Sequence, residues 1–381
     1  MPAAIGQPAP TGTGQLSAVS CAGRGHCWAV GTPGPPAPSP ATTGSTTTTS
    51  TTAPVPTTVI DATVNGGKTW VAQPLPLPAA PALTGISCPT VQLCMAVGLS
   101  GSASAGIVLT THRSGSVWGE VSYPAGATVI TSVECTSPVD CTVIASDGTT
   151  FWSAHSANFG HSWQRGGTLP AGLEDAGALS CVTGGPCLVT GFTTTTAGHG
   201  QGAIVISRDR GATWAAANVP AGTGLLQDAV CATVTSCLAA GTTSTTVSAV
   251  VPAKGEVLTS QDGGQTWNAS PSAPSVDDVF GIDCPSPRIC AVVGAKWVGH
   301  PAIGTGAVAQ SHDSGLSFTA STTAYTPLPL TALACFTARA CVAVGGNTVA
   351  SIALAQIKPS GPSTSTTPAS ARHRPGLNGV R

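Results

Sequence analysis

The chain has 381 residues, yet only 8% of them are charged and the formal net charge is −1 at pH 7. A nucleic-acid-binding protein shows a basic face, and a protein held at a membrane surface shows clustered lysines and arginines. The sequence has neither pattern, so we expect no nucleic-acid partner. We also expect no membrane span, because the apolar stretch at residues 349–357 is far shorter than the roughly 20 residues a spanning helix needs.

The composition favours short strands over helices. The 47 glycines and 32 prolines divide the chain into short runs of Val, Ile, Ala and Thr, and helical periodicity is hard to find anywhere. We therefore predict an all-β protein.

The 14 cysteines fall into seven pairs, each with five residues between its members. A zinc site needs four converging ligands, usually at closer spacing, and only His26 lies beside a cysteine. We therefore predict seven local disulfides worth about 2 kcal/mol each, no metal site and no cofactor. The predicted pairs are Cys21–Cys27, Cys88–Cys94, Cys135–Cys141, Cys181–Cys187, Cys231–Cys237, Cys284–Cys290 and Cys335–Cys341.

Disulfides imply an oxidising compartment, but the first residues do not look like an export signal. Residues 1–10 contain neither a basic segment nor an apolar one. Two explanations follow: a leader is missing from this chain, or the protein stays inside the cell with reduced thiols. We favour the first, and with it an extracytoplasmic (secreted or cell-surface) location, because reduced thiols have no evident reason to recur in register.

One unit of strands recurs along the chain. An apolar residue stands two places before the first cysteine of each pair, and an apolar run follows the second cysteine. In six units a glycine stands four residues after the second cysteine, and Ala145 takes that place in the remaining one. We interpret the two runs as strands joined by a five-residue turn, with the cysteines facing each other across the hairpin.

A third and a fourth strand complete each unit. In the fourth unit the third strand covers residues 203–206, and an eight-residue turn, residues 207–214, leads into the fourth. The first cysteines of successive pairs stand 46 to 53 residues apart, except for 67 residues between the first two. A Pro/Ser/Thr-rich insertion at residues 32–58 explains the exception and is predicted to be a solvated loop. The tail at residues 358–381 has a similar composition and is predicted to be disordered.

Six eight-residue turns, or octets, follow the pattern S/T-x-D-x-G-x-T/S-W/F. They are residues 63–70, 111–118, 156–163, 207–214, 260–267 and 311–318. Asn65 and Asn158 replace the Asp in two octets, and a third departs further with Arg113 and Val117. In register with the cysteine pairs, the octets resemble the Asp-box (BNR) repeat of sialidase-like β-propellers, and the resemblance covers about residues 1–357. We expect the octets to be structural, because their Asp or Asn accepts backbone N–H groups and their Gly allows positive φ.

Seven hairpins but only six octets leave the last unit one strand short. Elsewhere the final residue of an octet stands 17 or 18 residues before the next first cysteine, and counting back from Cys21 reaches Ala3 or Ala4. Residues 3–7 are therefore predicted to complete the last blade from the other end of the chain. We predict a seven-bladed β-propeller of four-stranded antiparallel blades, forming one domain over residues 1–357.

The up-and-down order of the strands divides the connections between two faces. The cysteine turns and the octets share one face, the turn face. The loops between second and third strands and the links between blades share the other, the loop face, and the family resemblance implies that a ligand binds there. The candidate binding residues are Trp297, His300, Asp228, Asp277, Asp278 and Glu256.

These features predict a non-catalytic, monomeric binding module or scaffold that recognises a protein or a glycan through the loop face. The alternative is a glycoside hydrolase of the same fold that uses two of the loop-face carboxylates. We do not expect a sialidase, because the family's arginine motif is absent and the only tyrosines, Tyr123 and Tyr325, lie in links between blades. No catalytic residue is predicted.

Overall fold

The structure is a computed structural model that describes residues 3–34, 60–73, 75, 77, 81–101, 104–194, 200–245, 254–272, 274–298, 303–320 and 326–354. Most of the insertion at residues 32–58, the tail at residues 358–381 and the candidate His300 lie outside the described residues. Across the described part of the chain, no helix is long and apolar enough to cross a membrane.

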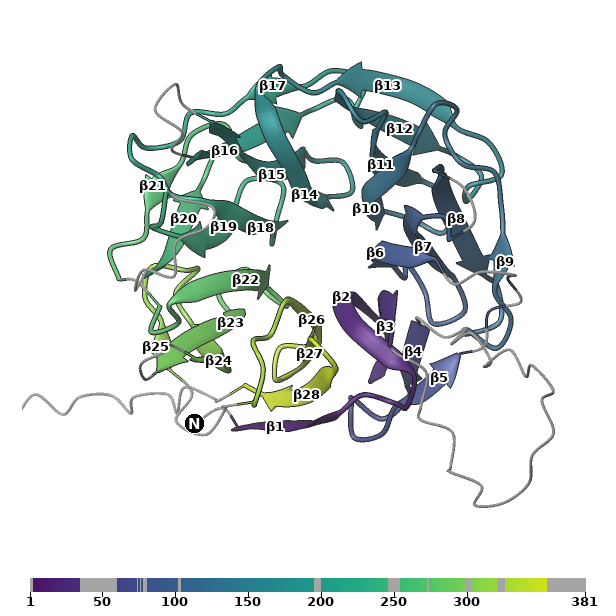
Figure 1. The fold of residues 1–381 in the computed structure, drawn as a ribbon. Helices are drawn as coiled ribbons and strands as arrows, with labels where there is room; N and C mark the ends of the chain where they lie inside the picture. The colour runs from purple at the N-terminus through teal and green to yellow at the C-terminus, as the bar shows by residue number, and fades with distance from the viewer. Residues whose placement is uncertain are drawn as a thin grey trace, which may run out of the picture.

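The described residues form seven four-stranded antiparallel sheets, the blades, around a central axis (Figure 1). This confirms the predicted all-β, seven-bladed β-propeller. From blade 1 to blade 7, the innermost strands are β2 (Thr13–Ala22), β6 (Ala82–Ser87), β10 (Val129–Cys135), β14 (Leu173–Cys181), β18 (Leu226–Cys231), β22 (Asp278–Asp283) and β26 (Ala332–Thr337). The second strands are β3 (His26–Pro33), β7 (Cys94–Leu99), β11 (Cys141–Ser146), β15 (Cys187–Thr194), β19 (Cys237–Thr242), β23 (Cys290–Val298) and β27 (Ala340–Gly345). The third strands are β4 (Ile60–Thr63), β8 (Gly106–Thr111), β12 (Phe151–Ser156), β16 (Gly200–Ser207), β20 (Gly255–Ser260), β24 (Ile303–Ser311) and β28 (Thr348–Ala353). The outermost strands are β5 (Val71–Gln73), β9 (Gly119–Glu120), β13 (Gln164–Thr168), β17 (Ala215–Ala216), β21 (Asn268–Ala269), β25 (Thr319–Ala320) and β1 (Ala3–Pro8).

The ring closes by pairing the first described strand with the last. β1 runs antiparallel to β28, in a register that extends from Ala3 opposite Ala353 to Pro8 opposite Thr348. Figure 1 shows β1, in purple, along the outer edge of the yellow last blade. The predicted closure by residues 3–7 is therefore confirmed. Because β1 covers the edge of β28, the backbone groups of that edge find hydrogen-bond partners inside the molecule.

Seven disulfides join the first and second strands of the blades, in the predicted pairs. In five blades the two cysteines are direct register partners, as Cys21 and Cys27 are in blade 1. None of the described cysteines is free. The bonds therefore hold the inner hairpin of every blade in register at its turn-face end.

In six blades a glycine stands four residues after the second cysteine, and sterics explain why no larger residue is found there. The inner strand of blade 6 carries a β-bulge near its start, and a Cβ at Gly294 would overlap the carbonyl oxygen of Asp278. In blade 5 a Cβ at Gly241 would overlap the carbonyl oxygen of Leu225 in the same way. A bulge bends the inner strand toward the second strand at this point, and a residue without a side chain accommodates the approach.

The hydrophobic core lies between neighbouring blades. Trp28 of β3 and Trp118, the last residue of the blade 2 octet, are each 1% exposed and share one buried cluster. The next cluster joins blades 2 and 3 and contains Met95 of β7 and Trp152 of β12. Each blade thus buries its faces against two neighbours, which explains why a single repeat could not fold alone.

The octets form compact turns whose polar groups bond to one another. In blade 5, Ser260 Oγ accepts the N–H of Gly264 at 2.9 Å and donates to Asp262 at 2.8 Å. Asp262 also accepts the Thr266 hydroxyl at 2.6 Å and the Thr266 N–H at 3.0 Å. The hydroxyl of Thr266 is the main cause that lowers the pKa of Asp262 to about 2. The bond from the glycine N–H to the first Ser or Thr recurs in all six octets.

Candidate functional site

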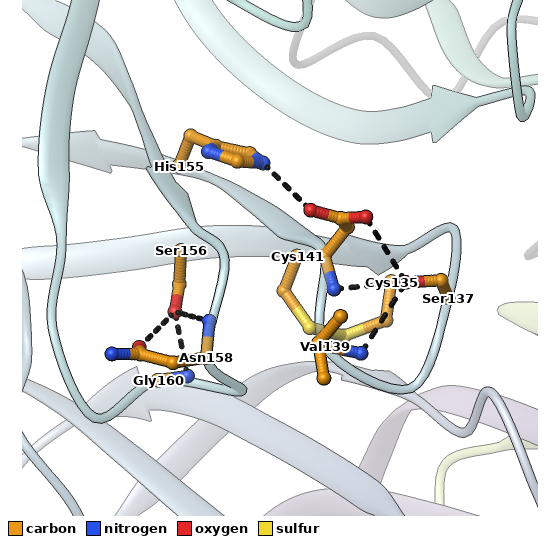
Figure 2. A network of polar contacts seen from close by, with 9 residues as sticks. Cys135, Ser137, Val139, Cys141, His155, Ser156, Asn158 and Gly160 are labelled. Carbon is orange, nitrogen blue, oxygen red and sulfur yellow. Dashed lines mark hydrogen bonds and ion pairs between the residues drawn. A yellow bond between two sulfur atoms is a disulfide. The ribbon is translucent and has the colours of Figure 1, made fainter.

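The turn face of blade 3 shows how its polar groups are used (Figure 2). Asp140 accepts a hydrogen bond from the Ser137 hydroxyl at 3.2 Å and lies 3.6 Å from His155 Nε2. The serine contacts the acid rather than the imidazole, so these groups lack the nucleophile–base–acid order of a hydrolytic triad. Beside them, Ser156 Oγ accepts the N–H of Gly160 at 2.8 Å and fixes the octet turn. These contacts stabilise the turns that contain them.

On the loop face, the hairpin of blade 6 extends further than that of blade 5. β23 and β24 have nine residues each, whereas β19 and β20 have six. Trp297 lies in a strand rather than in the connecting loop, because it belongs to β23 and stands opposite Gly304 of β24. The extended ladder holds the backbone of Trp297 more firmly than a loop would.

Two predicted acids, Asp277 and Asp278, hold Trp297 in place. One oxygen of Asp277 accepts Lys296 Nζ at 2.6 Å, and the other accepts the Trp297 N–H at 2.9 Å. Asp278 accepts the indole Nε1–H of Trp297 at 2.6 Å. Three of the six candidate residues therefore meet at one place, and the acids position the tryptophan.

The indole of Trp297 lies over a residue that has no side chain. A Cβ at Gly304 would stand 2.8 Å from Cζ3 of Trp297 and 3.1 Å from Cγ of Pro329. Leu328, the neighbour of that proline, is 39% exposed. We call the partly exposed Trp297, together with Leu328 and Pro329, the loop-face patch; these residues lie where blades 6 and 7 meet.

The other candidates lie elsewhere. Glu256 of β20 accepts the Gly224 N–H at 2.9 Å, and burial raises the pKa of Glu256. Asp228 was expected on the loop face, but it lies within the inner strand β18, just after a β-bulge, and it lines the central channel. His300 lies outside the described residues.

The central channel is a cavity of about 490 Å³ between the seven inner strands. Three carboxyl groups line it: Glu134 from β10, Asp228 from β18 and Asp283 from β22. None of the described residues that line the channel is Lys, Arg or His. Sequence reasoning missed Glu134 and Asp283, although each is an acid directly before a first cysteine, in a strand that is otherwise largely apolar.

Two of the channel acids also join neighbouring blades. Asp228 accepts the Ile282 N–H at 2.9 Å, and Asp283 accepts the Cys335 N–H at 2.6 Å. Ser87 makes the equivalent contact between blades 2 and 3, where its hydroxyl accepts the Cys135 N–H at 3.0 Å. The inner strands are therefore tied to one another around the channel.

The channel acids titrate far above their ordinary range. Burial, followed by repulsion from Asp283, raises the pKa of Glu134 to about 8. Burial likewise raises the pKa of Asp228 to about 7 and that of Asp283 to about 6. Burial therefore disfavours the ionised form of all three acids, most strongly that of Glu134. Among the described residues, no group of three or more His, Cys, Asp or Glu side chains is arranged to hold a metal ion.

No protein-family model and no curated protein matches this chain. Solved structures do match it, at low identity. YCF48 bound to D1 peptide is 13% identical with a TM-score of 0.61, over 93% of this chain and 97% of that chain. Virginiamycin B lyase from Staphylococcus aureus, an inactive variant with quinupristin, is 9% identical with a TM-score of 0.62, over 93% of this chain and all of that one, 100%.

A larger enzyme is also similar. The GH74 enzyme from Niastella koreensis is 12% identical with a TM-score of 0.60, over 90% of this chain but only 53% of the enzyme. This chain therefore spans about half the length of that protein. At these identities the similarity shows the propeller fold alone.

The channel acids predict a pH-dependent stability. The folded state binds the Glu134 proton more tightly than the unfolded state does, so the protein loses stability as pH rises from about 4.5 to about 8. Glu134→Gln removes this penalty and should raise the Tm at pH 8 relative to the wild type, with little difference at pH 4. Exposed Glu120→Gln is the matched control and should change neither value. Thermal unfolding from pH 4 to 8 measures the effect; identical pH profiles for Glu134→Gln and the wild type would contradict it.

Proposed function

We propose that this protein is a non-catalytic binding module that recognises a protein segment through the loop-face patch. The observation that carries this proposal is the fixed position of Trp297. Its N–H groups are bonded to Asp277 and Asp278, and Gly304 leaves room for its ring. A large aromatic side chain held in place before binding loses little entropy on association, and tryptophan is enriched among the residues that dominate binding energy.

The solved structures support a binding role. One similar propeller, YCF48, is bound to a peptide. A glycosidase would need two free carboxylates facing one substrate. On the loop face, Asp277 and Asp278 are instead occupied by Lys296 and Trp297, and Glu256 is bonded to a backbone N–H in blade 5. These contacts favour binding over the hydrolase alternative.

The octets support a place for the chain among Asp-box propellers. Their shared turn, with its glycine N–H bonded to the first Ser or Thr, is the geometry expected from the sequence pattern. We infer that the chain is a non-catalytic relative of that group. The turns stabilise the scaffold, and recognition depends on the loops that differ between blades.

Seven disulfides further support an extracytoplasmic location, because such bonds persist in oxidising compartments. Titration of free thiols in protein taken from its native compartment tests this placement. We expect no reactive thiol before reduction and 14 after reduction and unfolding, which is the number of cysteines in the sequence. Fourteen reactive thiols in the untreated protein would contradict the location.

Trp297→Ala tests the proposed binding site. Peptides selected on the wild-type protein from a random phage-displayed library should bind Trp297→Ala at least tenfold more weakly, because loss of a central aromatic anchor costs about 2 kcal/mol or more. Fluorescence anisotropy with the selected peptides measures the affinities.

Val234→Ala is the matched control, because Val234 is 47% exposed in a cysteine turn on the opposite face. It should bind the peptides within twofold of the wild type, and both variants should keep the wild-type circular dichroism spectrum. Peptides that bind Trp297→Ala as tightly as the wild type, or that lose affinity with Val234→Ala, would refute the site.

A further inference from the structure

The central channel contains three acids, an aromatic ring and a cavity, none of which belongs to the loop-face patch. We propose that it binds an organic cation that carries at least two amino groups, held between Glu134, Asp228 and Asp283. This site is separate from the loop-face patch, and it rests on the composition and geometry of the inner strands.

The described lining of the channel carries negative charge without a basic side chain beside it. The three acids come from blades 3, 5 and 6, so they converge on the channel from different directions. All three keep some exposed surface, although burial raises the pKa of each. Because the described lining holds no basic side chain, none of these lining residues supplies a positive charge to the three acids.

An aromatic ring also lines the channel. Phe280 of β22 lines the channel and is partly exposed. An aromatic face attracts ammonium groups through its quadrupole, so a phenyl ring beside carboxylates suits an amine. The hydroxyl of Ser132 also favours a polar ligand. Ser132, which lines the channel two residues before Glu134 on the same side of β10, is 7% exposed, and its hydroxyl makes no hydrogen bond to the described residues.

The volume of the channel suits an organic molecule better than a metal ion. A cavity of about 490 Å³ is much larger than a single metal ion requires. The acids also do not form a cluster that could ligate a metal directly among the described residues. A flexible chain with separated amino groups can instead reach several acids at once, and each ammonium group would be paired with a carboxylate or with the ring of Phe280.

Because binding is coupled to proton release, its affinity should depend on pH in a characteristic way. The ammonium groups bind the ionised carboxylates, so binding near pH 7 displaces protons from the acids whose pKa is raised. Affinity should therefore increase from pH 5 to pH 8. A surface site built from ordinary carboxylates is already ionised at pH 5, and its affinity would stay nearly constant over that range.

Isothermal titration calorimetry with spermidine as the probe tests the proposal on the full chain, at fixed ionic strength. We expect saturable 1:1 binding that tightens at least fivefold from pH 5 to pH 8 and releases protons at pH 7. The triple variant Glu134→Gln, Asp228→Asn, Asp283→Asn should bind at least tenfold more weakly, and Phe280→Leu about threefold more weakly. The Asn side chains keep an oxygen that can accept the Ile282 and Cys335 N–H groups.

The matched control is Glu120→Gln, Glu174→Gln, Asp175→Asn, which removes the same charge from three exposed acids and should bind as the wild type does. Trp297→Ala should also bind normally, so failure of the loop-face proposal and failure of this one are distinguishable. If the channel triple variant does not fold, Glu134→Gln and Phe280→Leu decide the result. Equal weakening in the surface triple variant, unchanged binding in the channel variants, or displacement of spermidine by equimolar CaCl₂ would overturn the proposal.

Discussion

The pairing of β1 with β28 is the interaction on which the rest of the structure depends. A blade cannot bury its two faces alone, and a ring of blades is complete only when its last sheet is complete. Here the last blade takes its outer strand from the opposite end of the chain. This closure fixes the positions of all seven inner strands relative to one another. The width of the channel, and the spacing of the loops around it, follow from that constraint.

Within the closed ring, the two faces use polar groups differently. On the turn face, hydroxyls and carboxylates are bonded to the turns that contain them, as Ser260 and Asp262 are in blade 5. On the loop face, Asp277 and Asp278 position a neighbouring aromatic side chain instead. In the channel, no Lys, Arg or His stands among the described lining residues around Glu134. The scaffold is therefore the same in every blade, and we propose that ligands bind in the places where the repeats differ.

The sequence was sufficient for the fold because each blade repeats the same local signals. The cysteine spacing marks the inner hairpin, the octets mark the outer turn, and the distance from Cys21 back to Ala3 reveals the strand that closes the ring. The site was harder to predict. Glu134 and Asp283 are 149 positions apart in the sequence, and only the ring brings both to one channel. Trp297 was a candidate from the sequence, but its contacts with Asp277 and Asp278 were not predicted. Its place in a strand depends on the length of the blade 6 ladder, which no local signal gives.

Because the account rests on closure, the cooperativity of unfolding tests it most directly. Differential scanning calorimetry of the oxidised chain, with and without residues 1–8, measures it. A closed ring should unfold in one transition whose calorimetric and van't Hoff enthalpies agree, whereas a stack of independent repeats need not. We predict a single transition for the intact chain, and a lower Tm with an earlier, separate transition when residues 1–8 are removed. Stepwise unfolding of the intact chain, or an unchanged transition without β1, would contradict it.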